Sequence, residues 1–419
     1  MVSTDKTKIL LDAGVKLGEV VEYPKIDDRT LREIDGIFVS HAHLDHSGYL
    51  PHIYTAGYRG NVFASKPTIE LINVLISDYM RLSNPENVSK EGLSKLAKGF
   101  KIFEFRKELK FRDLKIQQMF SGHILGSSMI KITDGNNSLI YSGDINLAKT
   151  RLFDGAETRD LQAKNLIIES TYGARKDVFP KEGVIVPKML KSIKDTINLG
   201  GKVIIPSFAV GRAQEILLLL DDYMNSGVIP KVPIYVDGMI NKALRIHRHN
   251  VIYCRKELQS RILMSDYDPF KSPNFVPVET KGTRSKVVND DDSSIIVTTS
   301  GMLTGGPIIY YLSKLAGNST HKLMIVGYQA AGTPGRLLQE GVRELRFENK
   351  RVEIKLNVET YHLSAHADRP QLETFVKKTA GLEDLFIVHG EKSKSEEFRE
   401  DISKKINAVV PKPEDEYKI

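Results

Sequence analysis

The sequence predicts an α/β protein, because short apolar runs typical of strands alternate with segments of helical periodicity. The chain has 419 residues, enough for two domains or for one domain with a large insertion. Hydrophobic residues make up 41% of it and charged residues 27%, as in an ordinary globular protein. Together these observations indicate a globular chain in which strands and helices are interleaved.

The expected strands are rich in β-branched residues and are bounded by Gly, Ser or Asp, which is typical of strands buried on both faces. In chain order they cover residues 36–40, 61–65, 115–120, 138–143, 165–170, 202–207, 232–237, 294–301, 321–327, 353–358 and 385–390. Apolar residues recur at helical spacing over 68–82 and 210–227, and the second stretch ends with a glycine. The charged segment 287–294 is expected to be a solvated loop.

The composition bounds the cellular setting and the partners. The single cysteine, Cys254, excludes a disulfide within the chain, predicts a cytoplasmic protein, and is itself expected to be a small core residue. The start lacks the apolar core of a signal peptide and no transmembrane segment follows, so no membrane partner is expected. Lys and Arg number 60 against 53 Asp and Glu, a formal charge of +7 that favours polyanionic partners without identifying one.

Four of the expected strands lead into a histidine or an acidic residue. GIFVS leads into His41, SLIYSG into Asp144, NLII into Glu169 and LFIV into His389. Strand ends and their loops are where α/β folds assemble sites on a rigid frame. Four such residues together therefore indicate a shared cluster.

The densest candidate for a metal site is the stretch VSHAHLDHSGYLP, residues 39–51, which holds three of the chain's 11 histidines. It supplies His41, His43, Asp45 and His46, and imidazole and carboxylate groups are the usual ligands of Zn²⁺. A His-x-His pair leaving a strand can direct both rings at one ion, which leaves Asp45 and His46 for a second ion nearby. The alternative interpretation is a polar helix-capping loop, with Asp45 or Ser47 as the cap, and for one histidine it would be preferred.

The motif HAHLDH resembles the His-x-His-x-Asp-His signature of metallo-β-lactamase-fold hydrolases, and its companions follow in order. SGHILGSS gives His123, YSGDI gives Asp144, and KILLDAG gives Asp12, which in that family supports the site without binding the metal. Three more motifs, IIESTYGAR, YHLSAHAD and IVHGE, resemble motifs A, B and C of the β-CASP nucleases. The resemblance covers nearly the whole chain, and GHILGSS with the compact length brings it closest to short archaeal cleavage-and-polyadenylation-factor-like ribonucleases.

The resemblance implies an αββα metallo-β-lactamase sandwich with an inserted β-CASP α/β domain that has its own parallel sheet. Residues 1–173 would form the first part of the sandwich, 174–358 the insertion, and 359–419 the C-terminal completion. A single strand of nucleic acid would lie between the domains. The chain departs from the family before TKILLD, where an extra hairpin of the form GGxxEVGRS is usual, so the first sheet is expected to lack that hairpin.

The resemblance also implies two zinc ions, with Asp144 bridging them. The other ligands of the first ion would be His41, His43 and His123, and those of the second Asp45, His46 and His389. Zinc lowers the pKa of bound water towards neutrality and so supplies a nucleophile for phosphodiester hydrolysis. Asp45 is counted among the catalytic residues as well as among the ligands.

Two further catalytic residues are implied by motifs A and B. His366 would be the general acid for the leaving oxygen, and Glu169 would hold it and keep it cationic. From the residues alone, a buried salt-bridge partner at Glu169 and a helix N-terminal residue at His366 are equally good interpretations.

The substrate contacts suggested by the sequence lie on a Gly-rich loop. Ser300 and Gly301, in TTSGMLTGG, follow an expected strand, and exposed backbone N–H groups there would suit a phosphate. The stretch RIHRHN, with His247 and His249, either contacts phosphates or forms a solvated helix face. The remaining histidines, His52, His321 and His362, are expected to be structural.

The implied function is zinc-dependent hydrolysis of phosphodiester bonds in single-stranded RNA, with endonucleolytic cleavage favoured and RNA processing or decay as the setting. The alternatives are a 5′→3′ exoribonuclease, a DNA-directed β-CASP nuclease, a small-molecule metallohydrolase of this fold, and an inactive RNA-binding subunit. Glu169, His366 and the inserted domain argue against the small-molecule enzyme, and the full ligand set argues against the inactive subunit. A homodimer or a complex with RNA-processing subunits stays open.

Overall fold

The structure is a computed structural model that describes residues 1–16, 21–83, 89–265, 267–347, 350–404 and 406–419. The chain folds into two compact units. Unit 1 comprises Met1–Lys149, Phe153–Val178 and His366–Ile419, and unit 2 comprises Thr150–Leu152 and Phe179–Ala365. Unit 1 is therefore built from both ends of the chain.

The first sheet of unit 1 has five strands in chain order: β1 (Val2–Ser3), β2 (Lys8–Leu11), β3 (Gly36–Phe38), β4 (Asn61–Ala64) and β5 (Phe100–Ile102). Strands β2 to β5 are parallel, and β1 is antiparallel to β2 with Val2 opposite Ile9. The sheet thus begins with a short antiparallel pair.

The second sheet of unit 1 has seven strands in the order β20-β19-β10-β9-β8-β7-β6. Their bounds are β6 (Glu108–Phe111), β7 (Leu114–Phe120), β8 (Ser128–Thr133), β9 (Ser138–Tyr141), β10 (Asn165–Glu169), β19 (Asp384–Val388) and β20 (Asn407–Val409). Strands β6 to β9 form an antiparallel meander, and β10, β19 and β20 continue the sheet in parallel with β9. Two C-terminal strands therefore complete a sheet begun far earlier in the chain.

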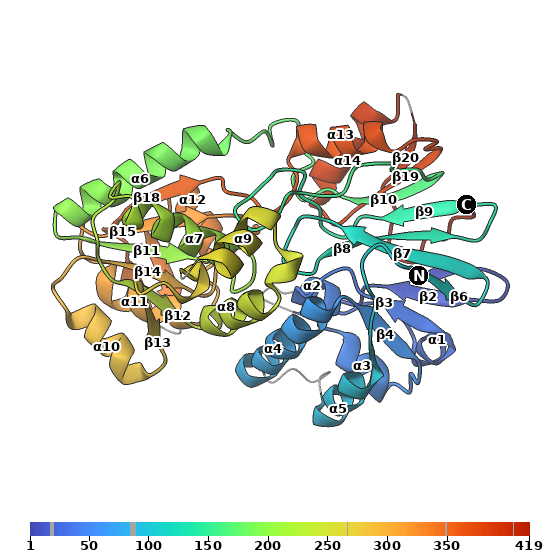
Figure 1. The fold of residues 1–419 in the computed structure, drawn as a ribbon, viewed down its shortest axis with the longest axis horizontal. Coiled ribbons are helices and arrows are strands. Elements are labelled where there is room, and N and C mark those ends of the chain that lie inside the picture. Colours follow the sequence, from blue (N-terminus) through green and yellow to red (C-terminus); the bar gives the residue numbers. More distant parts are fainter. Residues whose placement is uncertain (17–20, 84–88, 266, 348–349, 405) are drawn as a thin grey trace. The chain divides into compact units, whose positions relative to one another are not determined.

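The two sheets of unit 1 share one apolar core, because Ile9 and Phe38 from the first sheet lie in the same buried cluster as Ile116 and Ile130 from the second. Helices cover the outer faces (Figure 1). Those beside the second sheet are α13 (Arg369–Lys378) and α14 (Lys392–Ile402); those of the first half are α1 (Asp28–Glu33), α2 (Leu44–Ser47), α3 (Leu50–Thr55), α4 (Lys66–Ser83) and α5 (Lys90–Gly99). Unit 1 is an αββα sandwich.

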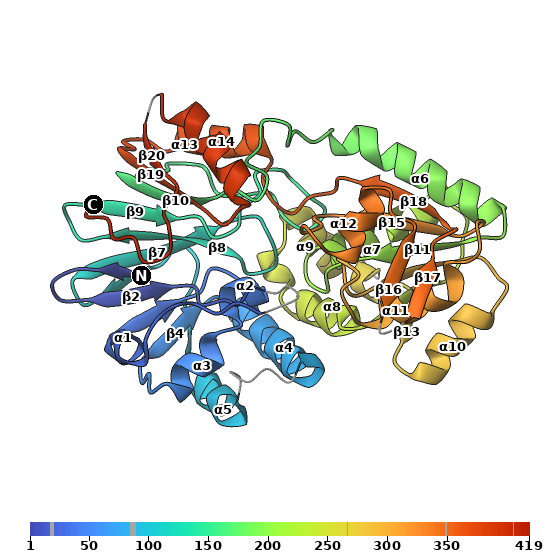
Figure 2. The ribbon, with the colours of Figure 1, turned by 180° about the vertical axis from the view of Figure 1, so that it is seen from behind.

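Unit 2 is built on a six-stranded sheet in which every pair of neighbours is parallel (Figure 2). In spatial order its strands are β13 (Phe275–Val278), β12 (Ile234–Asp237), β14 (Ser294–Thr298), β11 (Lys202–Pro206), β15 (Lys322–Val326) and β18 (Asn357–Tyr361). A hairpin of β16 (Glu344–Phe347) and β17 (Lys350–Glu353) is separate from it. The central strands β11, β14 and β15 are almost continuously apolar and buried, as expected for a parallel sheet covered on both faces.

Helices surround the sheet of unit 2. They are α6 (Glu182–Asn198), α7 (Arg212–Asn225), α8 (Ile240–His249), α9 (Lys256–Met264), α10 (Lys281–Asn289), α11 (Pro307–Leu315) and α12 (Pro334–Gln339), with short 3₁₀ turns at Val251–Tyr253 and Pro269–Lys271. Helix α11 buries Ile308, Tyr311 and Leu312 against the strands. No helix in the described part of the chain is long and apolar enough to span a bilayer.

The α/β fold class is confirmed, and two local predictions are wrong. Residues 353–358 were expected to be one strand, but Glu353 ends β17 and Asn357 begins β18, and the buried Ile354 and Leu356 between them belong to no strand. Their apolar character reflects burial and not pairing. The segment 287–294 is not a loop throughout, because its first three residues finish α10.

Candidate metal centre

The candidate site lies in unit 1, where strands of both sheets end. Strand β3 ends at Phe38, just before His41, and β9 ends three residues before Asp144. Glu169 is the last residue of β10, and His389 follows the last residue of β19. Strands β9, β10 and β19 are parallel neighbours, so their C-terminal ends meet at one edge of the sheet.

The histidine-rich stretch passes from a loop into a short helix. His41 and His43 precede α2, while Asp45 and His46 lie within it. The residue at the N-cap of this helix is His43, and no side-chain hydrogen bond caps it. The interpretation of Asp45 as a capping residue is therefore wrong, and its half-exposed carboxylate points elsewhere, to His389.

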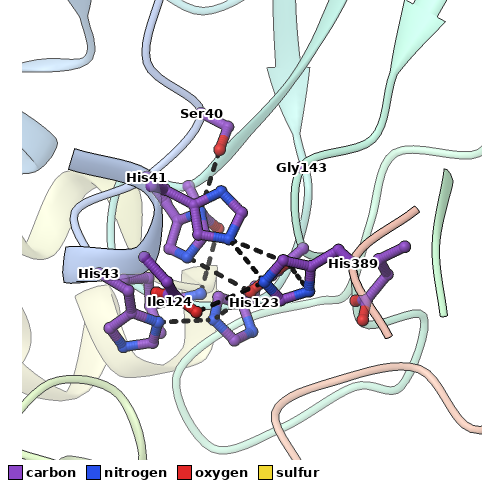
Figure 3. A network of polar contacts seen from close by, with 12 residues as sticks. Ser40, His41, His43, His123, Ile124, Gly143 and His389 are labelled. Carbon is purple, nitrogen blue, oxygen red and sulfur yellow. Dashed lines mark hydrogen bonds and ion pairs between the residues drawn. The ribbon is translucent and has the colours of Figure 1, made fainter. Parts of the chain in front are cut away.

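One group of potential ligand atoms lies around one carboxylate oxygen of Asp144, Oδ2. The Nε2 atoms of His41 and His123 lie 3.4 Å and 3.6 Å from Asp144 Oδ2, and His123 Nε2 lies 3.1 Å from His43 Nδ1. All ligand atoms of this group lie within 4.8 Å of one another. The rings of these histidines turn toward one another (Figure 3). We call His41, His43 and His123 the first ligand group.

A second group faces the other carboxylate oxygen. His46 Nε2 and His389 Nδ1 each lie 3.4 Å from Asp144 Oδ1, and His389 Nε2 lies 3.4 Å from Asp45 Oδ2. Ligand atoms of Asp45, His46 and His389 also lie within 4.8 Å of one another. We call these three residues the second ligand group. Asp144 stands between the groups with one oxygen toward each.

The electrostatics of the site fit a metal cation. Asp144 Oδ1 and His41 Nε2 are buried and accept or donate no hydrogen bond within the described chain. Burial lowers the pKa of His41, His43 and His123, that of His43 to about 3, so these rings are neutral and each offers a lone pair. Uncompensated, such an arrangement of buried polar atoms is costly, and a bound cation compensates it.

The carboxylate of Asp144 is ionised. Burial alone would raise its pKa, but the positive charges of His389 and His46 hold it well below the ordinary range. In return, although burial lowers the pKa of His389, the charge of Asp144 raises it to about 9. The buried carboxylate thus favours positive charge at this position, a charge that Zn²⁺ would supply in place of the ring protons, with ligands of the right type.

His366 and Glu169 form a separate pair at the edge of the ligand groups. His366 Nδ1 lies 3.0 Å and 3.2 Å from the two oxygens of the buried Glu169, and 3.9 Å from Asp144 Oδ2. Burial lowers the pKa of His366, but the charges of Glu169 and Asp144 raise it above its ordinary value. His366 is not a helix N-terminal residue, because α13 begins at Arg369 and Asp368 is its cap.

Asp12 lies beside the second ligand group, where it was expected to support the site. His46 Nδ1 donates to its Oδ2 at 2.7 Å. Two other partners of Asp12, Ser40 and Tyr141, were not identified from the sequence. The only signals were their positions, since Ser40 directly precedes His41 and Tyr141 ends the strand that leads to Asp144.

The substrate-binding residues expected from the sequence lie in unit 2, after β14. The Ser300 N–H donates to Gly305 O at 3.2 Å, so the open backbone donor expected at this position is not found. The Ser300 hydroxyl accepts from Thr304 N at 3.1 Å. Gly301 is buried, and its carbonyl accepts from Gln329 Nε2 at 2.9 Å. These bonds shape the loop itself.

The stretch RIHRHN forms the end of α8, and neither interpretation fits its first histidine. His247 is fully buried, and its Nδ1 lies 2.7 Å from the Ala243 carbonyl. Arg248 pairs with Asp268, while His249 is exposed. His321 is structural as expected, accepting from Lys202 N at 3.1 Å, and Cys254 is buried as expected.

Models of three protein families match the chain. A metallo-β-lactamase superfamily domain matches residues 1–171, a Beta-Casp domain 213–338, and a Zn-dependent metallo-hydrolase RNA specificity domain 351–411. The described sandwich, with its histidine-rich loop after β3, lies mostly within the first of these matches and the parallel sheet of unit 2 overlaps the second.

Curated proteins named transcription termination factor FttA are similar over nearly the whole chain. The one from Methanothermobacter thermautotrophicus is 34% identical over 94% of this chain and 64% of the relative. The one from Lokiarchaeum sp. is also 34% identical, over 99% of this chain and 68% of the relative. The chain thus spans less than two thirds of the first of these relatives. A crystal structure of a protein of unknown function from Enterococcus faecalis V583 shares the fold, with a TM-score of 0.58 at 13% identity over 98% of this chain and 94% of that one.

Proposed function

We propose that this chain, which belongs to the β-CASP branch of the metallo-β-lactamase superfamily, is a zinc-dependent hydrolase of phosphodiester bonds in single-stranded RNA. The observation that carries the proposal is the position of Asp144. Its two carboxylate oxygens face two separate groups of ligand atoms, each 3.4 to 3.6 Å away. Such an arrangement suits a pair of metal ions, which many phosphodiesterases use.

Two zinc ions fit the donors present. The first would be held by the first ligand group and the second by the second ligand group, with Asp144 shared between them. When bound, zinc lowers the pKa of water, supplies the nucleophile and stabilises charge on the phosphate. Asp45 is the most exposed carboxylate of the cluster. Of the proposed carboxylate ligands it therefore lies nearest to the solvent from which a substrate would arrive.

His366 is assigned the role of general acid. Its Nδ1 proton is donated to Glu169, which leaves Nε2 to carry the proton that a leaving oxygen needs. Because the charges of Glu169 and Asp144 raise the pKa of His366, they favour the doubly protonated ring that a general acid requires. Glu169 also accepts from Ile145 N at 2.8 Å, which fixes the orientation of its carboxylate.

The substrate class is supported by three observations. A domain model described as an RNA specificity domain matches residues 351–411, the formal charge is +7, and curated relatives are named for transcription termination. We infer that the substrate is a nascent transcript. It would be cleaved at internal phosphodiester bonds of the RNA, in the cytoplasm. Ser300 and Gly301 are kept as substrate contacts on the family resemblance. A 5′→3′ exonucleolytic mode is the second candidate.

The test uses single-stranded RNA and DNA, each labelled either at the 5′ end or internally, incubated with and without a chelator. We expect internal fragments from RNA alone, and none with the chelator. Mononucleotides released from the 5′ end would favour the exonuclease, and equal cleavage of DNA would overturn the RNA assignment. Asp144→Asn, purified in parallel, controls for a contaminating nuclease. If the active preparation and this variant cleave equally, the proposed function is wrong.

A further inference from the structure

The family resemblance already implies that Asp12 supports the site; we infer that two further residues act with it, Ser40 by passing its effect on to the ring proton of His41, and Tyr141 by holding Asp12 in place. The inference rests on the proposed function in one respect, since it takes His41 and His46 to be metal ligands. It assigns positioning roles to Ser40 and Tyr141.

Asp12 is buried and surrounded by hydrogen-bond donors. Its Oδ1 accepts from Ser40 N at 2.6 Å. Its Oδ2 accepts from Ser40 Oγ at 2.6 Å, from His46 Nδ1 at 2.7 Å and from Tyr141 Oη at 2.7 Å. A carboxylate has about four lone-pair positions, and an ionised one only accepts. Three donors thus face Oδ2 and one faces Oδ1, so Asp12 is engaged within the protein and is a poor metal ligand although it lies close to His41 and His46.

The direct effect is on His46. Because Asp12 can only accept, the proton of a neutral His46 ring must be on Nδ1. The lone pair is then on Nε2, which lies 3.4 Å from Asp144 Oδ1 and 3.1 Å from His389 Nε2. Asp12 thus directs the binding nitrogen of His46 into the second ligand group.

The indirect effect is on His41. The Ser40 hydroxyl has one proton, and it is used in the bond to Asp12. In its contact with His41 Nδ1 at 3.0 Å, Ser40 Oγ must therefore accept, so His41 Nδ1 carries the ring proton. The lone pair is left on Nε2, the buried atom that lies 3.4 Å from Asp144 Oδ2. The carboxylate of Asp12 thus fixes the position of the ring proton on one histidine in each ligand group.

Tyr141 completes the arrangement from the second sheet. It is the last residue of β9, so the strand that leads to Asp144 also brings its hydroxyl to Asp12. Asp12 directly follows β2 of the first sheet; its backbone is left-handed, φ 58°, and its N–H donates to Phe38 O at 2.9 Å. The Tyr141 bond therefore ties the carboxylate, held by one sheet, to the other sheet that carries Asp144.

The expected effects differ between the two positioning residues. Ser40→Ala removes the path to His41 only, so zinc binding at one of two positions should weaken by about 10- to 100-fold. Tyr141→Phe leaves both paths but loosens Asp12, so both positions should weaken, each by a smaller factor. Tyr58→Phe is the matched control, because this buried tyrosine of unit 1 donates to Asn61 O and not to Asp12.

The experiment titrates zinc-free protein with zinc in the presence of a competing chelator, for the unaltered chain and the three variants. Ring N–H proton resonances of the ¹⁵N-histidine-labelled, zinc-loaded proteins are recorded in parallel. We expect one hydrogen-bonded Nδ1–H resonance each from His41 and His46, beside those of His247 and His366, whose Nδ1 atoms face the Ala243 carbonyl and Glu169. Ser40→Ala should shift the resonance of His41 most, because His41 loses its own partner, while His46 keeps its bond to Asp12. Tyr58→Phe should change neither resonance.

Unaltered zinc affinities and resonances in both Ser40→Ala and Tyr141→Phe would overturn the inference. If Ser40→Ala does not fold, the unaltered protein still decides, because a proton on Nε2 of His41 or His46 contradicts the assigned geometry. The proposed function fails in a different way. Zinc binding with the expected resonances but no RNA cleavage would sink the nuclease assignment and leave the roles of Ser40 and Tyr141 intact.

Discussion

Among single residues, Asp144 is the one on which both ligand groups depend. It is 2% exposed, and its two carboxylate oxygens are divided between the groups. A residue that serves one group only, such as His123, should be less sensitive to substitution. This difference distinguishes a shared ligand from a merely adjacent one.

Asp144→Ala is therefore expected to lower bound zinc below the level left by His123→Ala, and to abolish cleavage. The reason is that His123→Ala removes one donor of the first ligand group and leaves the second group complete. Elemental analysis of the purified variants gives the zinc content. Two full equivalents of zinc in Asp144→Ala would rule out the bridging assignment.

His366→Ala should keep its zinc and its RNA affinity, yet lose roughly two to four orders of magnitude in cleavage rate, the usual share of a general acid. The loss should be smaller for a nitrophenyl phosphodiester, because that leaving group departs without a proton. Rates on RNA and on the activated diester are compared for the variant and the unaltered chain. Loss of zinc, or equal slowing of both substrates, would mean that His366 is a ligand or a structural residue.

Glu169→Gln should show the same pattern more mildly, since Glu169 orients the imidazole and favours its charge but touches no reacting atom. The double variant should cost little more than His366→Ala alone, as expected for residues that act as a unit. Cleavage rates of the two single variants and the double variant give the coupling. Additive losses would show that the two residues act independently.

That the residues of the two ligand groups lie together could be predicted from the sequence, because strand ends and fixed spacing determine where these residues go. His41, Asp144 and His389 each follow a recognisable strand, so their convergence follows from the sheet. The partners of Asp12 could not be found in this way, because which hydroxyl reaches a carboxylate depends on side-chain packing across two sheets. Likewise, the Ser300 N–H meets Gly305 O only because of the path of that loop.

Among the secondary-structure elements, apolar runs predicted strands correctly where their residues also pair with a neighbouring strand. Residues 353–358 misled because buried Ile354 and Leu356 fill the core of unit 2 between two strands. Helix α6 was not identified, because Pro187 lies inside it and β-branched residues precede the proline, both of which are typical of non-helical chain. Tertiary packing of its apolar face outweighs these local preferences.

The buried His247 on helix α8 should make the stability of the protein depend on pH. Burial lowers the pKa of His247 to about 4, below the 6.5 of an unfolded chain, so the unfolded state takes up the proton first as pH falls. Protonation of His247 should therefore leave the free energy of unfolding unchanged above pH 6.5 and lower it by up to about 3 kcal/mol as pH falls to 4. Between pH 7 and 5, His247→Leu should lose less stability than the unaltered chain, by about 2 kcal/mol.

Urea unfolding at pH 7 and pH 5, followed by circular dichroism, measures this difference. His249→Leu is the matched control, because His249 lies on the same helix but is exposed. It should leave the difference between the two pH values as in the unaltered chain. An unchanged pH dependence in His247→Leu would show that the buried ring does not govern the acid sensitivity of this helix.

For the molecule as a whole, the order of the chain determines when the site can form. The first ligand group lies entirely before residue 150, whereas His366 and His389 follow the whole of unit 2. Strands β19 and β20 bring these last residues back to β10 in parallel register. The second ligand group and the proposed acid therefore depend on closure of the sandwich by the C-terminal segment, while the first group does not.

Binding of RNA should be led by phosphates and tolerant of sequence, because the chain has a formal charge of +7. The affinity of the slow variant His366→Ala for single-stranded RNA should fall steeply as salt rises. Helix α10 supplies a specific test, since Lys281 and Lys286 are exposed on it, whereas Arg284 is engaged with Asp237 at 2.7 Å. Replacing both lysines by alanine should reduce the slope of log affinity against log salt by about 0.7 for each phosphate that a lysine had neutralised.

Fluorescence anisotropy of labelled RNA over a salt series gives these slopes. Lys191→Ala is the matched control, because Lys191 is also an exposed helical lysine of unit 2 but is paired with Asp195 at 2.6 Å. It should leave the slope unchanged if the exposed lysines of α10 bind phosphates. An affinity that does not vary with salt would contradict phosphate-led binding altogether and would revive a small-molecule substrate. A steep slope that the α10 substitutions leave unaltered would move the phosphate-binding residues to another basic surface.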